Sequence, residues 1–261
     1  MFNVTDAQIE AWLSLLAWPL FRILGIFATD PFFSSRTIPG RVRLGLALML
    51  TLLVAPSLPP LPDIAVVSPL GVLILVQQIL IGVAIGFTMR LVFASVEMAG
   101  HLAGLQMGLG FASFYDPQHG TNTAVVAQFT SLLTLLLFLA MNGHLVVIET
   151  IVHSFALLPI SAEPIKPAGF KLLVDAAGQI FVLGVLLSLP VLGALLITNL
   201  SIGVMSRAAP QFNVFAVGFP LTLGMGIAAL YLSLPQFPPH IHRLIDEATR
   251  LAYRVAKTFA G

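Results

Sequence analysis

The stretch AAGQIFVLGVLLSLPVLGALLITNLSIGVMS, residues 176–206, lies between Asp175 and Arg207 and contains no charged side chain. As one straight helix it would be about 45 Å long at 1.5 Å per residue, whereas the hydrocarbon core of a bilayer is about 30 Å thick. An apolar run of this length has to tilt, to bend at Pro190, or to continue into a protein environment outside the bilayer. The stretch therefore predicts an all-α membrane protein.

The composition of the whole chain leads to the same fold class. Of its 261 residues, 58% are hydrophobic and 9% are charged, whereas a soluble domain carries roughly 25% charged residues. Much of the exterior therefore has to face lipid or other apolar protein. A net charge of +1 argues against a nucleic-acid partner, which would need a concentrated basic face. The absence of cysteine excludes thiolate chemistry and sulfur-ligated metal sites.

Charged residues divide the chain into about six long apolar segments. Each is near or above the ~20 residues that a membrane-spanning helix needs, and we expect partly kinked helices arranged as hairpins within one domain. A further stretch with apolar residues at helical spacing predicts a C-terminal amphipathic helix, which either lies at the membrane interface or docks to a partner subunit. The segments are 9–28, 44–62, 69–96, 125–148, 172–205 and 214–234, and the amphipathic stretch is 239–260.

The basic residues give no clear orientation in the membrane. In a six-span chain, residues 36–43 and Arg207 would lie on one side, and Lys166, Lys171 and the basic residues of 239–260 on the other. Because Lys and Arg in short loops set the orientation, two comparably basic sides leave it undetermined. Either the number of spans differs from six or the protein is not an ordinary up-and-down bundle.

One basic residue, Arg22, lies inside the first apolar segment. An arginine near the middle of the membrane costs about 3 kcal/mol on insertion scales, which the Leu, Ile and Phe residues of the segment offset. We expect its side chain to face a partner or a cavity, or else to extend to the membrane interface.

The sequence contains none of the common catalytic motifs. The patterns HExxH, GxSxG and GxxxxGK[ST] are all absent. Glu97 and His101 stand four residues apart, a spacing that usually means a hydrogen bond on one helix face rather than a metal site. We therefore expect a protein that is not an enzyme and that needs no cofactor or metal.

Residues 100–117, GHLAGLQMGLGFASFYDP, combine closely spaced glycines with aromatic residues. Glycine every fourth residue forms a small-residue stripe that lets helices pack closely. Gly110 and Asp116-Pro117 are expected to end the helix and leave an apolar loop. That loop either packs against the helices or the interface, or forms a hydrophobic plug that seals a lumen by excluding water. The stripe is Gly100, Gly104 and Gly108, and the loop bears Met107, Phe111, Phe114 and Tyr115.

Five short motifs follow one another along the chain. They are Arg22 with Gly25 and Pro31, IPGRVR at 38–43, GFASFYDP at 110–117, NGHLVVIETIVHSFALLPI at 142–160, and SRAAPQFNVFAVGFP at 206–220. In this order, on a chain of this size and hydropathy, they resemble the FliR family of flagellar type III export-gate proteins over essentially the whole length. The fourth motif is more similar to the flagellar branch than to the related SctT-type subunits of virulence secretion systems.

The resemblance implies a non-enzymatic subunit of the export gate through which unfolded flagellar proteins cross the bacterial inner membrane at the flagellar basal body. The implied partners are FliP-like and FliQ-like gate subunits and an FlhB-like subunit. Residues 1–170 would be a FliP-like portion, and 171–261 a FliQ-like helical hairpin followed by the amphipathic tail. The turn of that hairpin would contain Arg207, Pro210, Gln211 and Asn213.

The resemblance also assigns a role to the aromatic loop. In the family, the loop after the glycine stripe plugs the closed pore, which places Met107, Phe111, Phe114 and Tyr115 in the plug. Two other functions stay open. One is the equivalent gate subunit of a virulence secretion system. The other is a stand-alone small-solute permease, which should show a polar binding site at mid-membrane depth and internally repeated halves.

Overall fold

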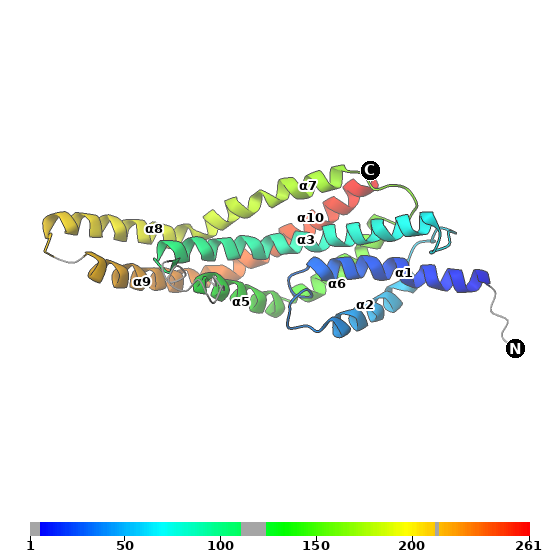
Figure 1. The fold of residues 1–261 in the computed structure, drawn as a ribbon, viewed down its shortest axis with the longest axis horizontal. Helices are drawn as coiled ribbons and strands as arrows, with labels where there is room; N and C mark the ends of the chain where they lie inside the picture. The colour runs from blue at the N-terminus through cyan, green and yellow to red at the C-terminus, as the bar shows by residue number, and fades with distance from the viewer. Residues whose placement is uncertain (1–5, 111–123, 212–213) are drawn as a thin grey trace. The chain divides into compact units, whose positions relative to one another are not determined.

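The computed structural model describes residues 6–110, 124–211 and 214–261, and these residues form helices without any strand (Figure 1). The helices, with two short 3-10 turns named η1 and η2, are α1 (Asp6–Thr29), α2 (Gly40–Val54), η1 (Ala55–Ser57), α3 (Pro69–Gln106), α5 (Val125–Ala140), α6 (Gly143–Leu157), α7 (Ala168–Ala177), α8 (Gln179–Ala208), α9 (Val214–Ser233), η2 (Leu234–Gln236) and α10 (Phe237–Ala260).

The predicted all-α membrane fold is confirmed. Among the described residues, five stretches are long and apolar enough to cross a membrane, and a sixth is added if α5 and α6, bent by 68°, count as one. One stretch combines α7 and α8 over 41 residues, Ala168–Ala208. A straight helix of that many residues would be about 60 Å long at 1.5 Å per residue, which is about twice the thickness of the hydrocarbon core.

Three helix boundaries differ from those expected. Helix α3 runs past the apolar segment 69–96 and ends at Gln106, four residues before Gly110, and it includes Gly100 and Gly104. The segment 125–148 is interrupted at Asn142, whose φ of 58° lies in the left-handed region that short polar side chains tolerate. The segment 44–62 is helical only to Val54, because Pro56 and the prolines of 59–62 cannot continue an α-helix.

The predicted C-terminal amphipathic helix is present as α10, Phe237–Ala260. Helix α10 follows α9 through η2, so that Ala216–Ala260 is one candidate span of 45 residues. Its apolar face, which includes Leu244, Ala248 and Val255, is buried. Residues Ile245–Gly261 belong to a compact unit of the chain itself. The apolar face therefore covers neither the membrane interface nor a partner, because the chain's own helices occupy it.

The chain separates into two compact units. The first contains Met1–Leu91, Asn142–Ala177 and Ile245–Gly261, and the second contains Val92–Met141 and Gly178–Leu244. These units are defined by which residues pack together. The expected boundary at residue 170 has a different basis, because it separates a FliP-like portion from a FliQ-like portion by family resemblance. The division into FliP-like and FliQ-like portions therefore stays a prediction.

In the first unit, α1 and α3 approach each other through glycines. A Cβ atom on Gly82 would overlap the carbonyl oxygen of Arg22, and one on Gly25 would lie 2.7 Å from the carbonyl oxygen of Ile79. Gly86, one turn after Gly82, likewise has no room for a Cβ beside Thr29. Lipid tails are as apolar as the helix surfaces, so close backbone contact of this kind is what favours helix association in a membrane.

Replacing Gly82 by alanine tests this contact. The added methyl group would strike backbone atoms that cannot move aside, and overpacking of this kind costs about 1–3 kcal/mol. Gly45 on α2 has open space around it, so Gly45→Ala is the matched control. Thermal unfolding in detergent is expected to show a lower midpoint for Gly82→Ala and no loss for Gly45→Ala. Equal midpoints for the two variants would contradict the contact.

Candidate functional site

Arg22 is held inside the first unit by hydrogen bonds that its side chain donates to acceptors on two other helices. Its side chain is 0% exposed. The Nε atom donates to Oε1 of Gln78 at 2.7 Å, and Nη1 donates to the carbonyl oxygen of Ser154 at 3.0 Å. The guanidinium also lies 4.3 Å from the ring centre of Phe155. Its Nη2 atom has no hydrogen-bond partner among the described residues. Arg22 therefore faces α3 and α6 inside the unit and does not extend to the interface.

These contacts explain how the chain tolerates a buried guanidinium. A charge in a low-dielectric interior is stable only when hydrogen bonds replace its lost water. The aromatic face of Phe155 adds a cation–π attraction. Gln78 reaches Arg22 because the glycines described above bring α3 against α1.

The residue after α1, Asp30, is a second buried charged group. Its Oδ1 accepts the backbone N–H groups of Phe32 and Phe33, each at 3.0 Å, in a turn that ends the helix. Its Oδ2 has no hydrogen-bond partner among the described residues. Asp30 also lines a cavity of about 10 Å³ together with Thr88 and Thr150. That volume holds about one water molecule. Burial raises the pKa of Asp30 to about 6, against the opposing effect of the two N–H groups.

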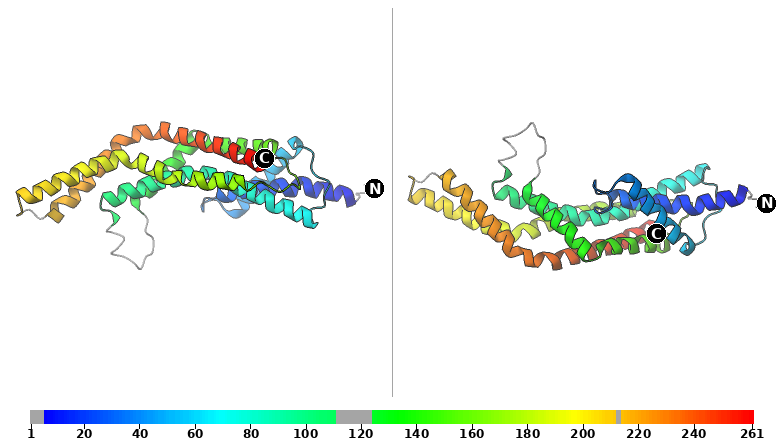
Figure 2. Two further views of the ribbon diagram at one scale, coloured as in Figure 1. Left: turned by 90° about the horizontal axis from the view of Figure 1, so that it is seen from above. Right: turned by 90° about the horizontal axis from the view of Figure 1, so that it is seen from below.

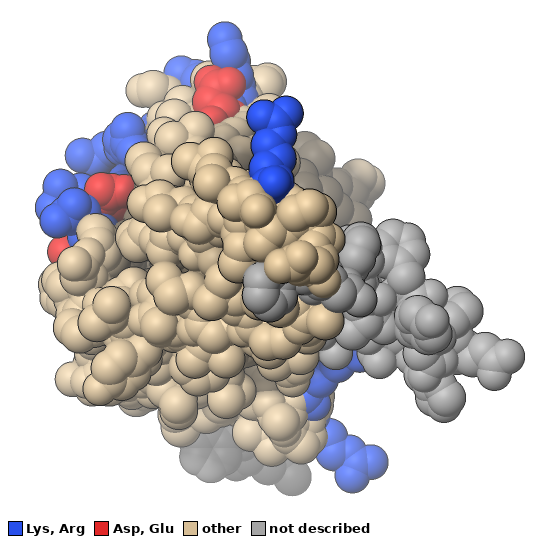
Figure 3. Space-filling model, turned by 90° about the vertical axis from the view of Figure 1, so that its left-hand side faces the viewer, with Lys and Arg blue, Asp and Glu red and all other residues tan. Residues whose placement is uncertain are grey.

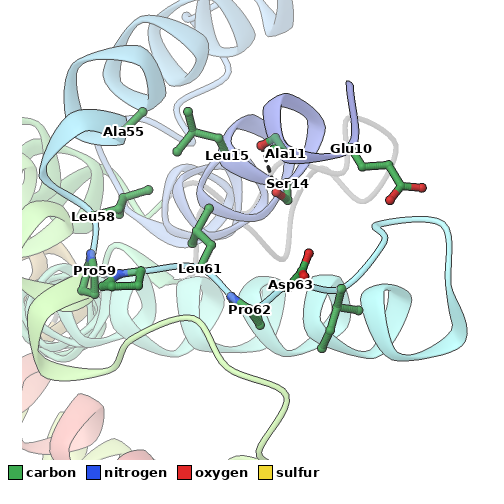
Figure 4. Close-up of a pocket in the computed structure, with 12 residues that line it drawn as sticks. Glu10, Ala11, Ser14, Leu15, Ala55, Leu58, Pro59, Leu61, Pro62 and Asp63 are labelled. Carbon is green, nitrogen blue, oxygen red and sulfur yellow. Dashed lines mark hydrogen bonds between the residues drawn. The ribbon is translucent and has the colours of Figure 1, made fainter. Parts of the chain in front are cut away.

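The larger surface cavity near the start of α1 is not arranged like a catalytic site. It has a volume of about 380 Å³ and lies between α1 and the proline-rich residues 58–64 (Figure 4). Its two carboxylates, Glu10 and Asp63, are exposed. In the part of the chain that the structure describes, no three His, Asp or Glu side chains gather as a metal site. Glu97 and His101 form an exposed pair at 3.9 Å.

The three glycines of the stripe have three different surroundings. A Cβ on Gly100 would lie 2.5 Å from Cα of Ala127, so at this position α3 and α5 are in backbone contact. A Cβ on Gly104 would make an ordinary contact of 3.6 Å with Val126. Gly108 lies beyond the end of α3 with a φ of 83°.

Gly108 ends α3 rather than extending the stripe. Its N–H donates to the carbonyl oxygen of Leu105, and the N–H of Leu109 donates to that of Gly104, both at 3.1 Å. Two such bonds around a left-handed glycine make a Schellman motif, a common helix terminus. The helical stripe therefore stops before Gly108, whose Cβ position lies 3.4 Å from the ring of Phe219, and its close-packing role stays a prediction.

Met107, which the resemblance assigned to the plug, is buried in the core of the second unit. It is 1% exposed and packs with the following residues: Ala103, Val126, Val191 and Leu195, and at the edge Leu109, Leu223, Ala229 and Leu230. In this conformation its side chain cannot line a lumen. Phe111, Phe114 and Tyr115 lie outside the described residues.

The hairpin of α8 and α9 carries a large exposed apolar surface. The two helices run side by side in all views (Figures 1 and 2). Figure 3 looks at the end where they meet, and most side chains facing the viewer are neither acidic nor basic. Arg207 lies in the last turn of α8, Pro210 and Gln211 follow it, and Asn213 lies outside the described residues. The exposed apolar residues include Phe181, Leu186, Leu196, Ile197, Leu200, Val204, Ile227, Tyr231 and Leu232.

Such a surface is unfavourable in water and indicates lipid or other protein around the hairpin. A chain with this hairpin and with long apolar helices is a membrane-embedded protein. A family model for bacterial export proteins, family 1, matches residues 13–248. These observations define the class as a helical membrane protein of bacterial protein export.

Several similar proteins carry the description flagellar biosynthetic protein FliR. The one from Pectobacterium carotovorum is 49% identical over 95% of this chain and 94% of its own length. The one from Escherichia coli is 45% identical over 96% of each chain, and the one from Bacillus subtilis is 27% identical over 82% of this chain and 83% of its own. The chain belongs to the FliR family, and it is a membrane-embedded subunit of the flagellar type III protein export gate.

Neither Gln78 nor Asp30 was singled out from the sequence, although their buried side chains make the contacts described above. The spacing of Gly82 and Gly86, four residues apart on one apolar segment, does indicate a close helix contact. Gln78 is one of two adjacent glutamines within an uncharged run, which marks it as a polar residue that needs a partner.

Replacing Gln78 by leucine tests the contacts of Arg22. The substitution leaves the buried Nε without its acceptor, and an unsatisfied buried group costs about 1–3 kcal/mol, more when it is charged. Gln77, its neighbour on α3, makes none of the Arg22 hydrogen bonds, so Gln77→Leu is the control. The unfolding midpoint is expected to fall clearly only for Gln78→Leu. A similar fall for both variants would mean that Arg22 does not depend on Gln78.

Asp30 is expected to make stability depend on pH. Its pKa in the folded chain, about 6, is above its ordinary value of 3.8, so the folded state binds the proton more tightly than the unfolded state. This contribution to stability is full below about pH 4 and is lost as the pH rises through 6. Asn at position 30 keeps an oxygen for the N–H groups of Phe32 and Phe33 but does not ionise.

Unfolding midpoints at pH 4 and pH 7.5 check this prediction. The difference between the two pH values is expected to be smaller in Asp30→Asn, with the variant more stable than the parent at pH 7.5. An unchanged pH dependence would show that Asp30 is solvated in the folded protein.

Proposed function

We propose that this subunit forms part of the wall of the export pore in the bacterial inner membrane and helps to plug the pore when it is closed. It moves no substrate by chemistry of its own, since the sequence has no phosphate-loop or hydrolase motif. The observation that carries the proposal is the packing of the residues that flank the aromatic segment 111–123 in the sequence. Met107 before it and Val126 after it belong to one buried cluster together with α8.

The partners in this proposal are FliP-like and FliQ-like gate subunits and an FlhB-like subunit, at the flagellar basal body. The apolar outer faces of α8 and α9 support it, because side chains such as Leu200 and Leu232 are exposed and need a cover. Residues 1–170 would take the FliP-like place and 171–261 the FliQ-like place. The cargo is unfolded flagellar protein.

The plug in this proposal consists of Phe111, Phe114 and Tyr115. Aromatic side chains that meet in a narrow lumen exclude water, and ions do not pass a dewetted constriction. Met107 has a different part, because its side chain is buried in the cluster with Val126 and Leu195. Gly100 supports the same region by holding α3 against α5.

The double substitution of Phe111 and Phe114 by alanine tests the plug. Loss of two large apolar side chains is expected to let ions leak through the assembled gate. The control replaces both residues by leucine, which keeps much of the apolar volume and should keep the seal. Ion conductance of membranes that contain the co-purified gate gives the comparison. If the alanine variant assembles in normal amount and the ion conductance does not rise, the proposed plug is contradicted.

A further inference from the structure

In the second unit, neighbouring helices cover α3 on two sides. A Cβ atom on Gly100 would lie 2.5 Å from Cα of Ala127, so α5 is in backbone contact with α3 at this point. A Cβ atom on Gly184 of α8 would lie 2.7 Å from Cγ of Met98. Because residues two apart on a helix point to different sides, α5 and α8 cover separate sides of α3.

A third side of α3 is left open. Between residues 92 and 106, only Glu97 and Leu105 are exposed, and His101 between them is partly exposed. These three residues follow one another at intervals of four, so they are neighbours on one helix face, which we call the open face of α3. On this face, Oε1 of Glu97 lies 3.9 Å from Nε2 of His101.

The open face differs in chemistry from the outer surface of the α8–α9 hairpin. The hairpin surface is built mostly of apolar side chains such as Leu196, Leu200 and Leu232. The open face instead carries an ionisable pair on a helix whose other residues are mostly apolar. Hydrocarbon cannot replace the water around a carboxylate, so this face is unfavourable in lipid.

Cover by another protein suits the pair no better. Burial would remove the water from Glu97 and His101, and this loss exceeds the attraction within an ion pair unless further hydrogen bonds replace the water. The pair also contributes little to the stability of α3, because both side chains are accessible to solvent. Water is therefore the environment that fits the open face.

We propose that the open face of α3 lines the water-filled lumen of the export gate and contacts the unfolded cargo protein as it passes. This rests on the proposed function, because it names the face with which the subunit forms the pore wall. An unfolded chain exposes apolar side chains, which would adhere to a surface like that of α8 and α9. Hydrated charged groups on the wall do not hold the cargo in this way.

Labelling of single cysteines tests whether water reaches the open face. The chain contains no cysteine, so each variant carries one thiol. Leu105→Cys places the thiol on the open face and Leu196→Cys places it on α8, where the parent residues are 65% and 61% exposed. A thiol in apolar surroundings stays unionised and reacts slowly. For the assembled gate in permeabilised membranes, we expect a charged maleimide to label Leu105→Cys several-fold faster than Leu196→Cys.

Two further variants complete the comparison. His101→Cys also lies on the open face and gives the same contrast if Leu105→Cys does not assemble. Ala103→Cys, at a position that is 2% exposed, reports the background rate of a buried thiol. Labelling of the open face no faster than that of Leu196→Cys or Ala103→Cys would overturn the inference.

Crosslinking to cargo tests whether this water belongs to the export lumen. A flagellar cargo protein with a folded domain fused to its trailing end is stalled in the gate, and a photoreactive group is attached to the introduced thiol. We expect crosslinks to the cargo from Leu105→Cys and His101→Cys and none from Leu196→Cys. Fast labelling without such crosslinks would also overturn the inference, since the water would then belong to another space.

The same crosslinks separate the inference from the proposed function. If the cargo is crosslinked from Leu196→Cys alone, the subunit still forms part of the pore wall, and only the assignment to α3 is wrong. If the stalled cargo is crosslinked to another gate subunit but to none of the three positions, the place of this subunit in the pore wall is contradicted as well.

Discussion

The hydrogen bonds of Arg22 are the interaction on which the first unit depends. A guanidinium without water needs acceptors from its neighbours, and here these come from Gln78 on α3 and Ser154 on α6. Gln78 reaches it because α1 and α3 are in backbone contact at Gly25 and Gly82. The charge and the glycines therefore favour one arrangement of α1, α3 and α6. Apolar packing alone would allow more than one arrangement.

In the second unit, α3 makes the corresponding contacts without any charge. Three close contacts involve glycine: Gly100 against α5, Gly184 of α8 against Met98, and Gly226 of α9 against Met107. Between apolar helices in lipid the hydrophobic effect gives little preference for one partner, so van der Waals contact at small residues decides which surfaces meet. The hairpin is tightly fitted toward α3 and apolar on its exposed side.

This combination suits a subunit that other proteins surround. An enzyme or a solitary carrier would present converging polar groups at a protected site. The described residues instead place their buried polar groups, such as Arg22 and Asp30, in contacts that hold helices and turns together. The exposed surface is mostly that of a helix pair that can pack against further helices, in keeping with a family that builds a protein export gate.

The sequence by itself determined the all-α membrane fold, the FliR family and the amphipathic pattern of 239–260, because hydropathy, helical spacing and motif order are properties of neighbouring residues. Only the tertiary structure decided what covers the apolar face of α10, that Met107 is buried, and that Gly108 ends a helix. It also decided the acceptors of Arg22, which lie 56 and 132 residues away along the chain. No local pattern encodes such pairs, because they depend on which helices meet and how closely.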